Sequence, residues 1–472
     1  MYLQLLGDEA FGLITFSMTL LGIAFILDMG ISSAFAREIA RDDCKSRIAN
    51  LLRSLELFYL GLVVLVTVLA APISYIIAYH WLNAPSLDTA LVQRCVILML
   101  MSSLVQVMMA LYNGGLMGSN RHVTAAGFQI GFSFVRSGLV IVPILLWTNL
   151  EIFFAWQLAS SLIFIFLMRR IVWNILYDAD IKPSFSLVSL RSIRNFAGGI
   201  FGITLISSIN TYSDKILVSK VFTLADFGDY SIASLIGQVP SMLALPLAVT
   251  MLPRLTGHFA RREIAELLDV FMRYSGLVAA VAFWSASAIV VLAPELLTII
   301  GSERPSATLV AVTRILAIGG ALLAVQYMPY HLAIACGHTR TNLFVGGVMA
   351  ASMPIALWFG AKTLGLVGVA WPWLLANAVA AVVLGRAIIP KFLGPHFFQW
   401  LINANFLQFA MAAVATYSIS WGMEFVLQDS LVRICVVGIA GTTLCTISLR
   451  YTDKIVNLRP YKLINQIFGT NI

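Results

Sequence analysis

The chain has 472 residues, of which 60% are hydrophobic and 11% charged, and its mean hydropathy is +0.91. Soluble globular chains carry roughly 25% charged residues, so this composition excludes an ordinary soluble enzyme or binding domain. The formal charge of +8 fits cytoplasmic loops that face anionic lipid better than it fits a nucleic-acid surface.

Long apolar stretches predict an all-α, polytopic transmembrane helix bundle, because a spanning helix needs about 20 mostly apolar residues. Thirteen stretches qualify: 10–34, 54–79, 91–116, 124–147, 151–172, 196–219, 229–252, 270–297, 306–335, 342–360, 365–389, 404–427 and 431–450. The stretch 196–219 is the weakest of them, since polar residues crowd its end.

The distribution of lysine and arginine predicts the orientation. With the C-terminus in the cytoplasm, 22 of the 30 basic residues fall on the cytoplasmic side, seven on the opposite side and one, Arg136, within a span. Such a bias is the positive-inside signature of membrane proteins. Thirteen spans would then place the N-terminus outside, so we expect a further helix upstream of Met1.

Four sequence matches at nearly one offset predict an internal repeat. Phe11-Gly12 recurs as Phe227-Gly228, 48–52 as 264–268, 118–121 as 337–340, and Trp156 as Trp371. Because six spans separate the matched positions, both copies have the same orientation, which predicts two parallel six-helix repeats. The predicted domains are an N-terminal bundle (1–194), a C-terminal bundle (195–395), and two extra helices with a cytoplasmic tail (396–472). The helix 196–219 has no counterpart in the first copy, which again predicts a missing first helix.

Arg136 is the clearest candidate for substrate binding. A charge near the centre of a bilayer costs about 2.5–3.5 kcal/mol on insertion scales, so intramembrane cations mark functional sites. Arg136 lies about twelve residues from each end of its span. It either contacts an anionic substrate in a cavity or pairs with a carboxylate or carbonyl between helices, and the sequence leaves both open.

Other polar residues within spans extend the predicted substrate-binding set, namely Asp214, Lys215, Asn210, Tyr212, Gln238 and Arg314. They could form a cavity wall or a coupled ion site. The alternative for Asp214 and Lys215 is a local salt bridge at the outer interface, with the lysine reaching toward the headgroups.

Charged residues at the inner helix ends form a second predicted group, for a gate or for substrate access: Asp28, Arg37, Arg121, Arg254 and Arg340. Asp28 and Arg37 could form a gate pair, or Asp28 could be a helix-end charge. The arginines could attract an anionic headgroup, although anchoring of the helices to anionic lipid explains them equally well.

No motif in the chain predicts an enzyme or a cofactor. There is no GxxxxGK[ST] loop for ATP hydrolysis and no HExxH spacing for zinc, and the five cysteines include no CxxC pair. We therefore expect neither a metal site nor a cofactor.

Several segments, in order, resemble bacterial O-antigen and exopolysaccharide flippases of the Wzx type. The quoted segments are LLGDEAFG (5–12), LDMG (27–30), AREIAR (36–41), YSDKIL (212–217), FGDYS (227–231), PRL (253–255), CGHTR (336–340) and GLVGVA (365–370). This family shares a superfamily with multidrug extruders and peptidoglycan-precursor flippases. Many of its members have 12 spans, so the additional pair at 404–450 departs from the pattern.

The resemblance implies a transporter that flips an undecaprenyl-pyrophosphate-linked oligosaccharide across the bacterial inner membrane. Membrane lipids, a glycan polymerase and glycosyltransferases are the implied partners, and nucleic acid is not. The alternatives are a cation-coupled multidrug exporter and a membrane-embedded glycan polymerase. Short outer loops disfavour the polymerase, and the cationic Arg136 favours an anionic substrate over a cationic drug.

Overall fold

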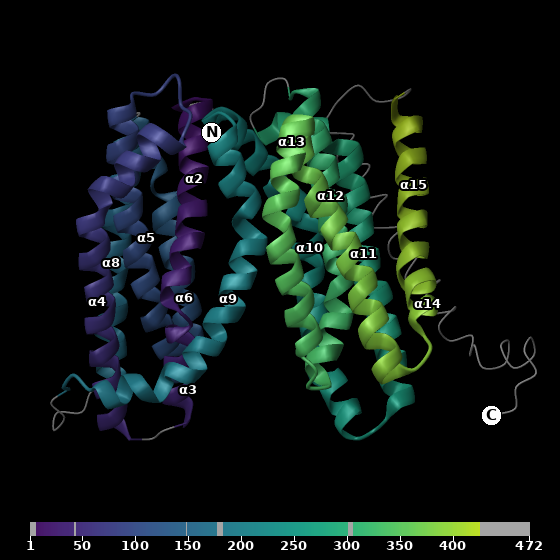
Figure 1. Cartoon of the computed structure of the whole chain (residues 1–472), viewed down its shortest axis with the longest axis horizontal. Helices are drawn as coiled ribbons and strands as arrows, with labels where there is room; N and C mark the ends of the chain where they lie inside the picture. Colours follow the sequence, from purple (N-terminus) through teal and green to yellow (C-terminus); the bar gives the residue numbers. More distant parts are fainter. Residues whose placement is uncertain (1–5, 42–43, 148, 177–182, 301–304, 425–472) are drawn as a thin grey trace, which may run out of the picture. The chain divides into compact units, whose positions relative to one another are not determined.

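The computed structural model of the chain describes residues 6–41, 44–147, 149–176, 183–300 and 305–424, with side chains to 418. Every regular element in this part is a helix, shown in Figure 1. The elements, in chain order, are α2 (Asp8–Ala24), η1 (Phe25–Asp28), α3 (Ile31–Arg41), α4 (Lys45–Ile76), η2 (Ile77–Trp81), α5 (Thr89–Gly118), α6 (His122–Ser133), η3 (Phe134–Gly138), α7 (Ile141–Trp147), α8 (Leu150–Leu176), α9 (Leu187–Val221), α10 (Leu224–Ala260), α11 (Ile264–Ile300), α12 (Ala307–Ala335), α13 (Arg340–Leu393), α14 (Phe397–Gln399), η4 (Trp400–Phe406) and α15 (Leu407–Glu424).

The helices confirm a polytopic membrane bundle. Ten helical segments of the described chain are long and apolar enough to cross a bilayer. Twelve of the thirteen predicted spans fall on helices, and the thirteenth, 431–450, lies outside the described residues. The predicted span 196–219 forms α9, which is not among the ten because it is too polar.

Two helix boundaries coincide with residues of positive φ, at Gly365 and at Met29 with Gly30. Gly365 has φ 62° and ψ −139° inside α13, so the helix breaks there into two arms, as the spans 342–360 and 365–389 predict. The span 10–34 was predicted too long, since Met29 and Gly30 have φ values of 51° and 71° and end the helix after Asp28. Only glycine adopts such a conformation at little cost.

Residues 1–228 form one compact unit. Within it α5 is central and packs against α2, α3, α4 and α8. The largest fully buried side chains of its core include Phe35, Tyr59 and Tyr112.

Helix α9 packs with this first unit, against α2, α3 and α4. At one end of α9, the Lys220 amine donates to the His80 carbonyl and lies 5.4 Å from the Trp81 ring centroid. The Trp81 indole N–H donates to the Ser219 hydroxyl at 3.1 Å. The sequence predicts that α9 begins the second bundle, at residue 195. In the structure α9 packs within the first unit, which extends to residue 228.

Residues 229–472 form the second unit, and the structure describes it to residue 424. Helix α12 packs against α11 and α13, and α15 packs against α11. Small side chains such as Ala279, Ala321 and Ala324 fill its core together with Phe271 and Trp400, which allows close helix contact.

The same turn ends α5 and α12. Each helix ends with two backbone hydrogen bonds, one that spans five residues and one that spans three. At the end of α5, the Arg121 N–H donates to the Leu116 carbonyl and the Asn120 N–H donates to the Met117 carbonyl. In the second, His338 bonds to Ala333 and Gly337 to Ile334. Asn120 and Gly337 both have positive φ, 56° and 68°, as the Schellman motif requires. The structure therefore matches Asn120 with Gly337, two residues away from the sequence match of 118 with 337.

Candidate functional site

Arg136 lies in a wide helical turn in the middle of a membrane-spanning segment. The π-helical turn η3 follows α6, and its geometry leaves backbone carbonyls without their usual partners in the helix. Two side chains of α8 bind these carbonyls: the Trp156 indole donates to Val135 O at 3.0 Å, and Gln157 Nε2 donates to Arg136 O at 3.2 Å. Because these bonds fix the turn, they also fix the position of the arginine.

The Arg136 side chain points into a small polar cavity. Its Nε donates to the Gln157 side-chain oxygen, and its guanidinium carbon is 5.8 Å from the Phe132 ring centroid. The cavity has a volume of about 10 Å³ and is lined by Ser17, Leu21, Met99, Ser102, Ser103, Gln106, Arg136, Phe154 and Gln157. This volume accommodates about one water molecule. We call these nine residues the Arg136 cluster.

Among the described residues, the side-chain partners of Arg136 are neutral. Its side-chain partners in the described chain are the Gln157 amide and the Phe132 ring, and neither is a carboxylate. A charge within a membrane is ordinarily paired or functional. Of the two alternatives for Arg136, the structure shows pairing with a carbonyl between helices, the side-chain oxygen of Gln157, and contact with a substrate stays a prediction.

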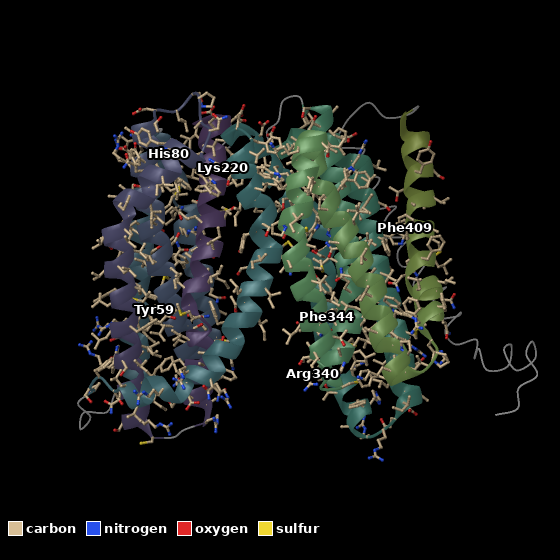
Figure 2. All side chains as sticks on the ribbon, in the orientation of Figure 1. Tyr59, His80, Lys220, Arg340, Phe344 and Phe409 are labelled. Carbon is tan, nitrogen blue, oxygen red and sulfur yellow. The ribbon has the colours of Figure 1, made fainter. Side chains whose placement is uncertain are left out.

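Asp28 is buried at the elbow between η1 and α3. Its carboxylate accepts hydrogen bonds from the Ser32 hydroxyl at 2.8 Å, from the Ser32 backbone N–H at 3.3 Å and from the Tyr59 hydroxyl. Figure 2 labels Tyr59 on α4. The bond to the backbone N–H satisfies a donor in the first turn of α3. Asp28 is thus held by neutral groups, while Arg37 stacks 4.3 Å over the Phe196 ring.

Glu56 is a buried carboxylate that the sequence analysis did not single out. It accepts hydrogen bonds from the Tyr112 hydroxyl at 2.8 Å, the Trp173 indole at 2.7 Å and Arg169 Nε at 2.8 Å, and Arg53 lies at 3.4 Å. The network joins α4, α5 and α8. The sequence contains a signal for it, because Glu56 is the one glutamate of the predicted span 54–79. A charged residue within a span is ordinarily paired or functional, which is also the reason for choosing Arg136.

The predicted polar residues of α9 lie on the first unit. The Tyr212 ring packs against Gly22 of α2, where an added Cβ would come within 2.1 Å of the ring. The Lys215 amine is 5.8 Å from the same ring centroid, and its backbone N–H donates to the Asp214 carboxylate at 2.8 Å. Asn210 is half-buried on the same helix.

The predicted residues of the second unit make local contacts. Gln238 donates to the Ser234 hydroxyl at 3.2 Å, and exposed Arg314 donates to the Val290 carbonyl at 2.8 Å. Gln326 donates to the Asn377 side-chain oxygen at 2.9 Å, which links α12 with the second arm of α13.

The predicted access arginines are exposed at helix ends or near them. Arg121 precedes α6, and Arg340 is the first residue of α13. Arg254 lies 3.4 Å from the Tyr274 hydroxyl.

In the turn that follows α10, a hydrogen bond from His258 lowers the pKa of the Glu263 carboxyl, with Arg261 adding to the effect.

Comparison with solved structures identifies the fold. The lipid II flippase MurJ in an inward closed conformation superposes with a TM-score of 0.73 at 14% identity, over 95% of this chain and 93% of that one. An inward-facing multidrug resistance MATE family transporter of the MOP superfamily gives a TM-score of 0.68 at 20% identity, over 83% and 93%. At such identities the similarity concerns the fold. No curated protein matches the chain.

Residues 1–258 match the family described as polysaccharide biosynthesis protein. The match covers more than half of the chain, and it confirms the resemblance inferred from the quoted segments at the level of the family. This multi-pass membrane protein belongs to the polysaccharide biosynthesis protein family.

Proposed function

We propose that the protein flips a polyprenyl-pyrophosphate-linked oligosaccharide, an O-antigen or exopolysaccharide repeat unit, from the cytoplasmic to the outer leaflet of a bacterial inner membrane. Membership of the polysaccharide biosynthesis family supports a glycan substrate. The observation that carries the proposal is Arg136, a cation in a membrane span whose neighbours are neutral polar groups.

The substrate needs a polar environment with a positive charge. A hydroxyl moved into hydrocarbon without a partner costs several kcal/mol, and a bare anion costs tens of kcal/mol. The serine and glutamine side chains of the Arg136 cluster suit sugar hydroxyls, and the guanidinium suits a phosphate oxygen. The cavity has room for only about one water molecule. The helices that line it must therefore separate before the substrate can bind.

Alternating access by two parallel repeats is the proposed mechanism. Helices begin at Asp8 and Leu224, Lys45 and Ile264, Thr89 and Ala307, and His122 and Arg340, pairs that stand 216 to 219 residues apart. The matching Schellman turns after α5 and α12 add to this support. Two like-oriented bundles that rock against each other can expose one site to each side in turn.

The buried carboxylate of Asp28 supports a multidrug exporter as a second candidate function. A buried carboxylate held by neutral hydroxyl groups can bind a proton or a metal cation, and acidic groups suit cationic drugs. Glu56 does not serve this role in the same way, since Arg169 and Arg53 neutralise it.

A flipping assay separates the two functions. The full chain is reconstituted in liposomes with a fluorescent polyprenyl-pyrophosphate oligosaccharide, and a membrane-impermeant quencher reports movement between leaflets. We expect flipping above that of protein-free liposomes and no uptake of a lipophilic cationic dye under a proton or sodium gradient. Dye uptake without flipping would overturn the flippase and establish the exporter.

Cysteine labelling tests the proposed orientation. Cys44 lies exposed in the segment between α3 and α4, and Ser86 lies between η2 and α5. In a chain with one cysteine at either position, a membrane-impermeant maleimide should label Ser86→Cys from outside and Cys44 only after permeabilisation. The reverse pattern would invert the topology.

A further inference from the structure

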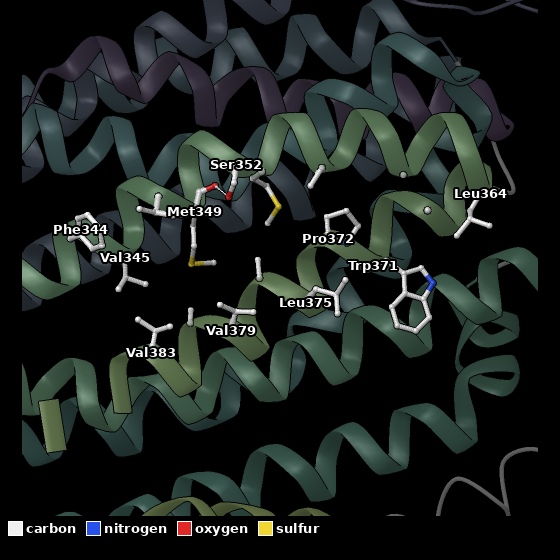
Figure 3. Close-up of a pocket in the computed structure, with 17 residues that line it drawn as sticks. Phe344, Val345, Met349, Ser352, Leu364, Trp371, Pro372, Leu375, Val379 and Val383 are labelled. Atoms are coloured by element: carbon white, nitrogen blue, oxygen red, sulfur yellow. Dashed lines mark hydrogen bonds between the residues drawn. The ribbon is translucent and has the colours of Figure 1, made fainter. Parts of the chain in front are cut away.

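The two arms of α13 enclose an apolar groove of about 640 Å³ on the second unit, shown in Figure 3. Its volume lies within the range of about 300–1,000 Å³ that is typical of small-molecule sites. Seventeen residues line it, and the side chains are apolar except for Ser352 and the indole N–H of Trp371. The Ser352 hydroxyl already donates to the Met349 carbonyl.

The groove has a floor of small residues and walls of large ones. At Gly360 and Gly368 the arms touch: a Cβ added to either residue would lie within about 2 Å of the carbonyl oxygen of the other. Ala356 and Ala376 continue the floor. The walls are exposed apolar side chains, namely Phe344, Val348, Leu364, Trp371, Leu375, Val379 and Val383. A long, flexible apolar chain fits such a shape.

Positive charge gathers at one end of the groove. Arg340 lies four residues before Phe344, and Arg386 lies three residues after Val383, so each is a neighbour of a wall residue on its helix. The Lys391 amine lies 3.3 Å from a ring nitrogen of His338. Figure 2 shows Arg340 beside Phe344. The distribution of lysine and arginine in the sequence predicts that this end lies on the cytoplasmic side.

The positive charge at one end of the groove indicates which kind of lipid would bind there. Any lipid chain could cover an apolar face, but an apolar groove that ends in exposed cations complements an amphiphile with a long tail and a phosphate at its end. Cations near a membrane surface contribute about 1 kcal/mol each toward an anionic headgroup. Only one lysine of α13, Lys362, lies toward the opposite end, and it is 5.1 Å from the Trp358 ring centroid.

We propose that the groove between the arms of α13 binds the polyprenyl tail of the lipid-linked substrate, with its phosphate near Arg340. The inference rests on the proposed function and adds a tail site on the second unit. It makes the second unit part of substrate recognition even though its groove is apolar.

Photolabelling of the full chain in zwitterionic lipid nanodiscs tests the site. The probes are a photoreactive polyprenyl phosphate and the corresponding uncharged polyprenol. We expect both to label peptides of α13. Ala356→Phe fills the floor and should reduce labelling about tenfold, the equivalent of 1.4 kcal/mol. The control Ala351→Phe changes an exposed alanine of the same arm that does not line the groove, and it should label like the unchanged chain.

Further variants separate the contributions of the head and the tail. Arg340→Ala should weaken labelling by polyprenyl phosphate about fivefold and leave labelling by polyprenol unchanged. Ala376→Leu narrows the groove from the second arm if Ala356→Phe does not fold. Equal labelling of the groove-filling and control variants would overturn the tail site. Equal competition by phosphatidylglycerol would show a general lipid groove and also overturn it. Flipping by the unchanged chain is measured separately, so failure of the tail site and failure of the flippase give different results.

Discussion

Two pairs of helices that follow the same turn differ in their chemistry. In the first unit α6–α7 and α8 follow the Schellman turn at Asn120, and hydrogen bonds of Trp156 and Gln157 hold them together. In the second unit the arms of α13 follow the turn at Gly337, and they meet at glycines. Met353, which stands 217 residues after Arg136, is buried and lines the apolar groove.

The difference shows that the same arrangement of helices can form either a polar cavity or an apolar groove. Where polar side chains bind the free carbonyls of a widened turn, the helices are joined by directional bonds, and a cation can be placed between them. Where small residues bring backbones together, the larger side chains are displaced outward and leave a groove. Under the proposed function, polar recognition belongs to the first pair and apolar recognition to the second.

Removal of Glu56 should have the largest effect, because the polar network of the first unit depends on it. Glu56→Ala leaves the Tyr112 hydroxyl and the Trp173 indole without their acceptor, and each buried polar group left unsatisfied costs about 1–3 kcal/mol. Thermal unfolding in detergent should show the loss. The control, Glu151→Gln, breaks the exposed pair with Arg94 and should cost much less, because water screens exposed ion pairs. Similar costs for both variants would contradict a buried network.

Arg136→Ala should strongly reduce flipping while the protein remains in the membrane. A hydrogen bond to a charged group contributes about 1.5–3 kcal/mol, so we expect a loss of about tenfold to a hundredfold in a flipping assay. Arg136→Lys should keep part of the activity, and Arg94→Ala should keep all of it. Full glycan export by Arg136→Ala in cells would exclude the residue from the site.

Gly368→Leu should destabilise the second pair. Its side chain would overlap the carbonyl oxygen of Gly360, and such overpacking typically costs about 1–3 kcal/mol. Gly347→Leu is the matched control, since a Cβ at Gly347 of the same element meets no atom within 4 Å. Comparison of their unfolding temperatures tests the contact, and equal values would show that the glycines do not hold the arms together.

Trp156→Phe should have the smallest effect of the four. It removes one hydrogen bond to Val135 O in the widened turn and keeps most of the ring, so we expect a cost of about 1 kcal/mol. Hydrogen exchange of the amides of η3 is a direct measurement, and exchange should quicken there and not in α13. Unchanged exchange in η3 would mean that the turn persists without the indole.

The sequence predicts the helices well because a bilayer requires long apolar segments. The break at Gly365 was predicted from composition and spacing alone, and the helix boundary after Asp28 was missed because Met29 is apolar. The polar residues that line the cavity with Arg136 were not predicted. Gln157 and Gln106 lie in other spans, and one sequence does not show which faces of three helices meet.

The reciprocal contact of Gly360 and Gly368 has a consequence for catalysis of transport. With backbone against backbone there is no side chain to change rotamer at this contact, so we expect the two arms to move together near the break at Gly365. A tail held there, with its phosphate near Arg340, is bound before the headgroup crosses, so its binding free energy belongs to the initial complex. Shortening the lipid chain should therefore raise the half-saturating concentration.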